Sequence, residues 1–124
     1  MPSRFQMLQR GDGQLRWRLL SGNYKVLGVG PHWYGNFEAV IVELARVRSA
    51  AVRRTPAVHR LSGGWKWTLD GDEGGGGATS SRSFARRVEA ELSAARFCAQ
   101  ATIAPVHPVV ATYPSPHAHR GLRS

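Results

Sequence analysis

Two short stretches, Leu15-Arg16-Trp17-Arg18-Leu19 and Trp65-Lys66-Trp67-Thr68-Leu69, decide how this chain folds. They align without a gap, and both read as an apolar residue, a basic residue, Trp, a polar residue and Leu. Apolar and polar residues that alternate in this way are typical of a β-strand with one buried face. The Trp and Leu side chains would lie on one face, with Arg16, Arg18 and Lys66 on the other. A match at two places in one chain predicts an internal repeat.

Turn signals flank both stretches in the same order. Gly11-Asp12-Gly13 precedes the first stretch and Ser62-Gly63-Gly64 precedes the second, and turns of this composition join the strands of a hairpin. The segments before these turns alternate as strands do. Ser21-Gly22-Asn23 follows the first stretch and leads into a third predicted strand over residues 24–29.

The second copy departs from this pattern after Asp70, because Gly74 to Gly77 stand where the third strand should be. Glycine loses much backbone entropy on folding and has no side chain to pack, so we expect that strand to be short, degraded or absent. The loop lacks the Lys-Ser/Thr ending of a phosphate-binding P-loop, and its Asp72 and Glu73 would repel phosphate. Asp70 and Asp72 have no further metal ligands nearby.

Each copy ends in a helical pattern with a capping residue at its start. Asn36 caps the first predicted helix and Ser83 the second. Apolar residues recur at three- and four-residue steps in both helices: Phe37, Val40, Ile41, Leu44 and Val47 in the first, and Phe84, Val88, Leu92, Ala95 and Ala99 in the second.

These observations predict an α+β fold with two tandem β-β-β-α repeats, which form a pseudo-symmetric antiparallel sheet with one helix per repeat packed on it. Repeat one covers residues 1–50 (strands 4–9, 14–20 and 24–29; helix 36–50), a linker covers 51–56, and repeat two covers 57–101 (strands 57–61 and 65–69, a weak third strand, helix 83–101). Residues 102–124 are predicted to be a flexible tail rich in Pro and His. The alternative is that Val106, Val109, Val110 and Tyr113 dock on the body as an extended segment.

The order of strands, turns and helix resembles the YegP-like family of small bacterial and archaeal proteins. The resemblance rests on residues 5–49, above all Gly13 to Leu19 and Ser21-Gly22-Asn23, and on Gly64 to Leu69 in the second copy. It covers most of residues 4–101 and none of the tail. The resemblance implies an α+β fold in which two repeats combine as a pseudo-dimer. It implies no catalytic residues, because the function of the family is unknown.

The chain is strongly basic, with 17 Lys and Arg against 8 Asp and Glu among 124 residues, a net charge of +9. Only Lys25 and Lys66 are lysines, and arginine suits phosphate because its planar fork donates two hydrogen bonds. The alternative is a GC-rich coding sequence, which raises Arg, Ala, Gly and Pro together. The charge is spread along the chain, and a dispersed charge indicates nucleic acid less strongly than a basic stripe.

The leading functional hypothesis is a non-enzymatic module that binds DNA or RNA through a basic sheet face. Arg16, Arg18 and Lys66 share that face if the two copies lie side by side, and Lys25 on the third strand completes the set. The alternative for these residues is an ordinary solvated face. The alternative function is a protein-interaction or homodimerisation module, because a weakened third strand in copy two would leave an open sheet edge.

The remaining candidates favour structural roles. His32-Trp33-Tyr34 is expected to anchor the strand-to-helix connection, and Cys98 to be a small buried apolar residue. His107, His117 and His119 are expected to be solvated, since one Cys and a few unspaced His do not make a zinc site. We therefore expect no catalytic residues, no metal and no cofactor. A lone thiol and no signal peptide predict a cytoplasmic protein.

Overall fold

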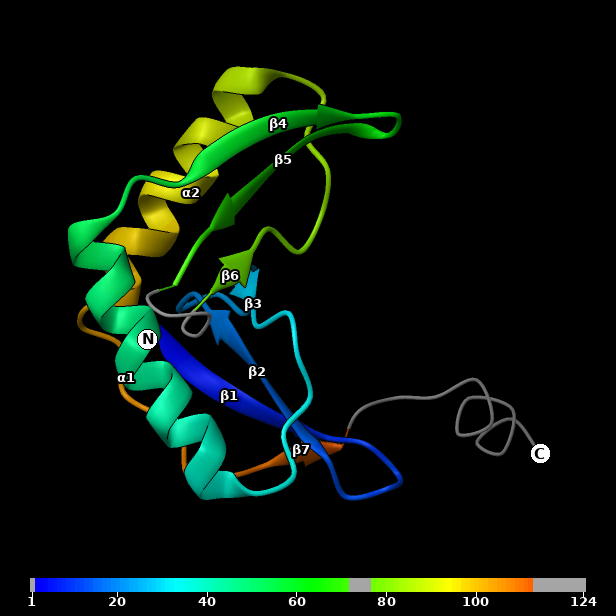
Figure 1. Cartoon of the computed structure of the whole chain (residues 1–124), viewed down its shortest axis with the longest axis vertical. Helices are drawn as coiled ribbons and strands as arrows, with labels where there is room; N and C mark the ends of the chain where they lie inside the picture. Colours follow the sequence, from blue (N-terminus) through cyan, green and yellow to red (C-terminus); the bar gives the residue numbers. More distant parts are fainter. Residues whose placement is uncertain (1, 72–76, 113–124) are drawn as a thin grey trace.

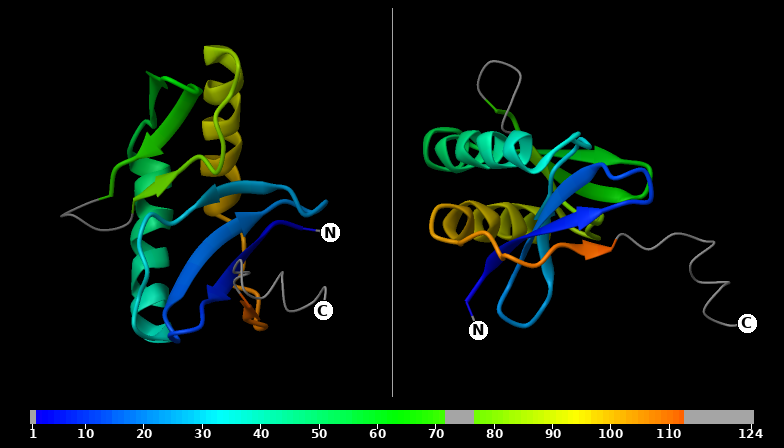
Figure 2. Two further views of the ribbon diagram at one scale, coloured as in Figure 1. Left: turned by 90° about the vertical axis from the view of Figure 1, so that its right-hand side faces the viewer. Right: turned by 90° about the horizontal axis from the view of Figure 1, so that it is seen from below.

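The computed structural model describes residues 2–71 and 77–112 and has an α+β fold. A seven-stranded sheet has two helices packed against one face, and neither these nor any other helix of the described residues covers the opposite face (Figures 1 and 2). The elements are β1 (Arg4–Gln9), β2 (Leu15–Leu20), β3 (Val26–Val29), α1 (Phe37–Arg53), β4 (Ala57–Leu61), β5 (Gly64–Leu69), β6 (Ala78–Thr79), α2 (Arg87–Ala101) and β7 (Ala111–Thr112).

The sheet is mixed and larger than predicted, with the strand order β4-β5-β6-β3-β2-β1-β7. The expectation of a purely antiparallel sheet is wrong because β7 pairs with β1 in parallel. The segment before β7 also lies along β1: the Phe5 amide donates to the Pro105 carbonyl at 2.8 Å, and the His107 amide donates to the Phe5 carbonyl at 2.8 Å. Residues up to 112 of the predicted tail thus dock as an extended segment, and residues 113–124 lie outside the described part.

The third strand of the second half, β6, lies in the middle of the sheet. It has only two residues and follows the glycine run, of which residues 74–76 lie outside the described part. It pairs with β5 on one side and with β3 on the other, where Thr79 is opposite Val29. The expectation that this weak third strand leaves an open sheet edge is wrong, because β6 is paired on both sides.

Several backbone contacts of the first half recur 50 positions further along the chain. Leu15 and Tyr34 exchange two amide-to-carbonyl hydrogen bonds at 2.8 and 2.7 Å, and Trp65 and Phe84 exchange two at the same distances. The amide of residue 30 donates to Trp17, and the amide of residue 80 donates to Trp67, both at 3.0 Å. Val29 and Thr79, which face each other between β3 and β6, are also 50 positions apart.

Phe97 of α2 lies in the centre of the core between the two repeated tryptophans. Its ring centroid is 6.0 Å from Trp17 in a stacked arrangement and 5.0 Å from Trp67 in a tilted one, and all three side chains are 0% exposed. The contact is close enough to require a glycine beneath it. A Cβ at position 28 of β3 would lie 2.5 Å from Phe97 Cδ1, so replacing Gly28 with any other residue would displace the ring.

The helices differ from the prediction in their starts and in the face they bury. Asn36 caps α1 as predicted, since its side-chain oxygen accepts from the Ala39 amide at 2.8 Å. Ser83 does not cap α2, because Phe84 is held against Trp65 and the helix begins only at Arg87. The predicted apolar stripes are wrong in part. Phe37 and Ile41 in α1, and Val88 and Leu92 in α2, are exposed, while α2 buries Ala90, Ala94, Phe97 and Ala101.

We expect Phe97→Ala to lower the free energy of unfolding by about 3–5 kcal/mol, the usual loss for truncating a buried aromatic ring. Leu92→Ala is the matched control on the same helix, because Leu92 is 65% exposed and belonged to the stripe predicted from sequence. Its effect should stay within about 0.5 kcal/mol. Urea denaturation followed by circular dichroism measures both variants. Equal losses would contradict the assignment of Phe97 to the buried face of α2 and of Leu92 to the exposed one.

Candidate nucleic-acid interface

The helix-free face of the sheet brings together three of the four basic residues selected from sequence. Alternation along β2 points Arg16 and Arg18 away from the core, because Trp17 between them is fully buried. Lys66 is placed in the same way beside Trp67 on β5. All three line one hollow of about 370 Å³, together with Val29 and Thr79 at the centre of the sheet.

Two of these cations are held in place by neutral acceptors. Arg16 Nε donates to the Gly30 carbonyl at 2.6 Å, and Arg18 Nε donates to Gln6 Oε1 at 2.8 Å. Among residues 2–71 and 77–112, no carboxylate forms an ion pair with Arg16, Arg18 or Lys66. Their positive charges are therefore not compensated by any described acidic residue, and the guanidinium groups remain able to donate to an anion.

Burial lowers the pKa of Arg18 from its ordinary value. The ordinary value for arginine is so high that the guanidinium stays protonated at neutral pH. A partly desolvated cation is costly unless an anion or strong acceptors compensate it. Gln6 is a neutral acceptor, so no described negative charge offsets the desolvation of Arg18.

Trp33, which the sequence predicted to anchor the strand-to-helix connection, flanks this face and contacts two arginines. The guanidinium carbons of Arg10 and Arg16 lie 4.4 and 5.7 Å from its ring centroid. Such stacking restrains the arginine side chains. The neighbouring Tyr34 packs against the core and so anchors the connection, as expected, whereas His32 is exposed.

Lys25 does not join the other three basic residues. It lies in the turn before β3 and is exposed, whereas the sequence placed it on the strand. It borders a different hollow of about 620 Å³ between that turn and α2, where Arg82 and Arg96 are also found. The prediction that Lys25 belongs to the basic sheet face is therefore wrong.

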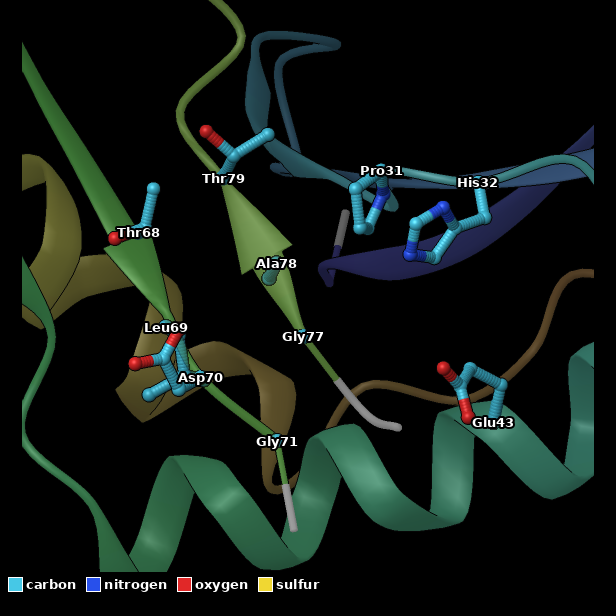
Figure 3. Close-up of a pocket in the computed structure, with 10 residues that line it drawn as sticks. All are labelled: Pro31, His32, Glu43, Thr68, Leu69, Asp70, Gly71, Gly77, Ala78 and Thr79. Atoms are coloured by element: carbon cyan, nitrogen blue, oxygen red, sulfur yellow. The ribbon is translucent and has the colours of Figure 1, made fainter. Parts of the chain in front are cut away.

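A further hollow of about 410 Å³ carries acidic groups and does not suit phosphate. Figure 3 shows the Glu43 carboxylate on α1, Asp70 at the end of β5 and the His32 ring around it. Glu43 accepts a hydrogen bond of 2.8 Å from the Tyr34 hydroxyl and lies 3.6 Å from Arg46. The Tyr34–Glu43 pair could not be predicted from sequence, because a loop residue and a helix residue meet only in the folded protein.

The other sequence candidates do not form a site within the described part of the chain. No group of three His, Cys, Asp or Glu residues that could hold a metal ion occurs there. Burial raises the pKa of the half-buried Cys98 thiol, which weakens it as a nucleophile. Asp72, His117 and His119 lie outside the described residues. None of the described helices has the length and apolar character needed to cross a membrane.

The Tyr34–Glu43 pair gives a pH-dependent stability. Desolvation, reinforced by the Glu43 carboxylate, raises the pKa of Tyr34 above its ordinary value of 10.0. The unfolded chain therefore loses this proton first, and the contribution of Tyr34 is complete below about pH 10 and is lost as the pH rises further. We expect the unfolding free energy of Tyr34→Phe to fall less steeply than that of the parent between about pH 9 and 11. Parallel slopes in urea titrations across this range would refute the assignment.

Comparison with known proteins supports the fold. No family model matches the sequence, and no curated protein matches it. The solution structure of yegP from E. coli, a protein of unknown function, is 20% identical and has a TM-score of 0.76 over 93% of this chain and 97% of that chain. A UPF0339 protein from Shewanella oneidensis is 12% identical and has a TM-score of 0.70 over 96% and 98%. The chain therefore has the fold of the YegP-like proteins, and the resemblance seen in its sequence is confirmed at the level of the fold.

Proposed function

We propose that this protein binds nucleic acid through the helix-free face of its sheet. The observation that carries the proposal is the convergence of Arg16, Arg18 and Lys66 on one hollow without a described carboxylate partner. The net charge of +9 would also raise the rate of association with a polyanion.

Contacts on this face would be made to phosphates rather than to bases. Trp17 and Trp67 point into the core, so neither is available for stacking on this face. The Trp33 ring at its flank already stacks against Arg10 and Arg16. Base stacking is the usual source of affinity in single-strand binders whose sheets carry aromatic residues. Phosphate contacts alone predict binding with little sequence preference and a strong dependence on salt.

We expect the double variant Arg16→Gln with Arg18→Gln to weaken binding at least about tenfold at low salt, since each residue makes a charge-assisted contact worth on the order of 1 kcal/mol or more. The slope of log affinity against log salt should fall by about 2 for duplex DNA, close to one unit for each lost phosphate contact. Fluorescence anisotropy of labelled duplex DNA, single-stranded DNA and RNA over a salt series measures both quantities.

The matched control is Arg53→Gln with Arg86→Gln, which removes the same charge from exposed positions on and beside the helices. It should weaken binding less than the sheet-face variant, and both variants should keep the circular dichroism spectrum of the parent. If the two double variants lose affinity equally, the effect is general charge and the sheet face is not the site. If the parent binds none of the three ligands near physiological salt, the nucleic-acid proposal is wrong.

A second candidate function is protein interaction, which includes homodimerisation. The observation in its favour is the strand β4, which forms the end of the sheet and pairs only with β5 among the described residues. An exposed strand edge presents backbone groups that another chain can pair with. Light scattering over a concentration range tests homodimerisation, and a constant monomeric mass would remove that form of the proposal.

We also propose that the two halves are copies of one β-β-β-α unit related by a pseudo-twofold axis between Val29 and Thr79. The recurrence of backbone hydrogen bonds at a spacing of 50 residues supports this, as does the strand order β4-β5-β6-β3-β2-β1. The position of Tyr34 then corresponds to Phe84, and that of Glu43 to Ser93, which accepts a hydrogen bond from Trp67 Nε1 at 3.0 Å.

If the halves are equivalent, Phe84→Tyr and Ser93→Glu together should recreate the Tyr34–Glu43 hydrogen bond in the second half. We expect each single variant to be destabilised, and the double variant to regain about 0.5–2 kcal/mol relative to the sum of the two. Urea denaturation of the parent, both single variants and the double variant measures this coupling. A coupling of zero would count against the equivalence of the two positions.

A further inference from the structure

The outer edge of β1 is covered by an extended segment of the same chain. The Phe5 amide and carbonyl both bond to this segment, at Pro105 and His107, and Leu8 and Gln9 pair with β7 further along. Ala104 at the start of the segment is 1% exposed. The first half of the sheet therefore ends in a small apolar segment that runs parallel to its edge strand.

The edge of β4 has the same geometry but no such segment among the described residues. The carbonyls of Trp65 and Trp67 accept hydrogen bonds on the side of β5 away from β4. The hydrogen-bonded pairs between β5 and β4 are therefore Lys66 with His59 and Thr68 with Ala57. Hydrogen-bonded and non-hydrogen-bonded pairs alternate along antiparallel strands. Val58 and Arg60 are in non-hydrogen-bonded pairs, so their amides and carbonyls point outward from the sheet. These are the groups that a further strand would use.

A groove of about 400 Å³ with apolar walls lies beside this edge, and its lining also includes Thr55, Arg87 and Glu91. Its walls come from Pro56 and Val58 on one side and from Ala94 and Ala95 of α2 on the other. Such small side chains leave room for the short apolar residues that cover the corresponding edge of β1. Pro56 has no amide hydrogen, so pairing can begin only at Val58, and the contact would be short and reversible.

The charge around the groove selects the kind of partner. Arg87 lines the groove, and the guanidinium groups of Arg60 and Arg87 both stack on the Trp65 ring, at 5.8 and 5.6 Å from its centroid. The described lining holds one carboxylate, Glu91, which accepts a hydrogen bond of 3.4 Å from Arg87. A second copy of this chain also carries a charge of +9, so its approach along this edge is disfavoured. An acidic segment is favoured.

We propose that the β4 edge and its groove bind an extended acidic segment of another protein, with small apolar residues that enter the groove and a direction parallel to β4. The proposal rests on the second candidate function above and names the chemistry of its partner. It does not depend on the basic sheet face.

The test uses the full chain and a fluorescein-labelled peptide that copies residues 104–112 with His107→Asp and Thr112→Glu. We expect it to bind, to shift the backbone amide signals of Val58 and Arg60 in NMR spectra, and to bind several-fold more tightly than the unaltered copy. Ala95→Glu should weaken binding at least tenfold, because it fills the groove with a like charge. Ala99→Glu, an exposed position one turn further along α2, should change it less than twofold.

The proposal is overturned if the acidic peptide does not bind, if it shifts the amides of Arg16 and Arg18 instead, or if the two alanine variants weaken it equally. Light scattering tests homodimerisation independently of the peptide, so failure of the acidic-segment proposal can be told apart from failure of the protein-interaction proposal. A monomer that binds the peptide keeps the inference and excludes homodimerisation. A dimer that ignores the peptide keeps protein interaction and excludes the acidic segment.

Discussion

The contact of Phe97 with Trp17 and Trp67 is the constraint on which the rest of the structure depends. One ring from α2 is shared by strands of both halves, so neither half can complete its core without the other. The same contact decides which residues reach solvent. Since a one-residue slip of a strand exchanges its two faces, burying the tryptophans of β2 and β5 commits Arg16, Arg18 and Lys66 to the opposite face. The basic hollow is thus a consequence of how the core is packed.

The buried face of each strand could be predicted from sequence because it depends on local alternation with a period of two. The buried face of α2 could not be predicted, because this helix has alanines on several sides and its exposed Val88 and Leu92 resemble part of an apolar stripe. The start of α2 was missed for a related reason. Ser83 has the composition of a cap, but the pairing of its neighbour Phe84 with Trp65 keeps that part of the chain extended. Both errors arise where tertiary contacts override local preference.

In the candidate site too, local alternation could be predicted from sequence and tertiary contacts could not. Arg16, Arg18 and Lys66 follow from alternation, whereas the position of Lys25 depends on a turn in which Tyr24 adopts a φ of 66° and on a register shift between Leu19 and Leu20. The Tyr34–Glu43 hydrogen bond and the stacking of Arg10 and Arg16 on Trp33 depend on how a loop crosses the sheet. No spacing in the sequence encodes those distances, so only the structure could place them.

The parallel pairing of β1 with β7 has a consequence for the order in which the protein folds. These are the first and last strands of the described chain, so this part of the sheet closes only after the chain has been made as far as Thr112. Contacts between such distant residues form slowly, because a long loop must close before any pairing energy is gained. During synthesis, the hairpin of β1 and β2 would emerge from the ribosome with its outer edge uncovered. That edge then presents unpaired backbone groups to neighbouring chains until β7 pairs with it.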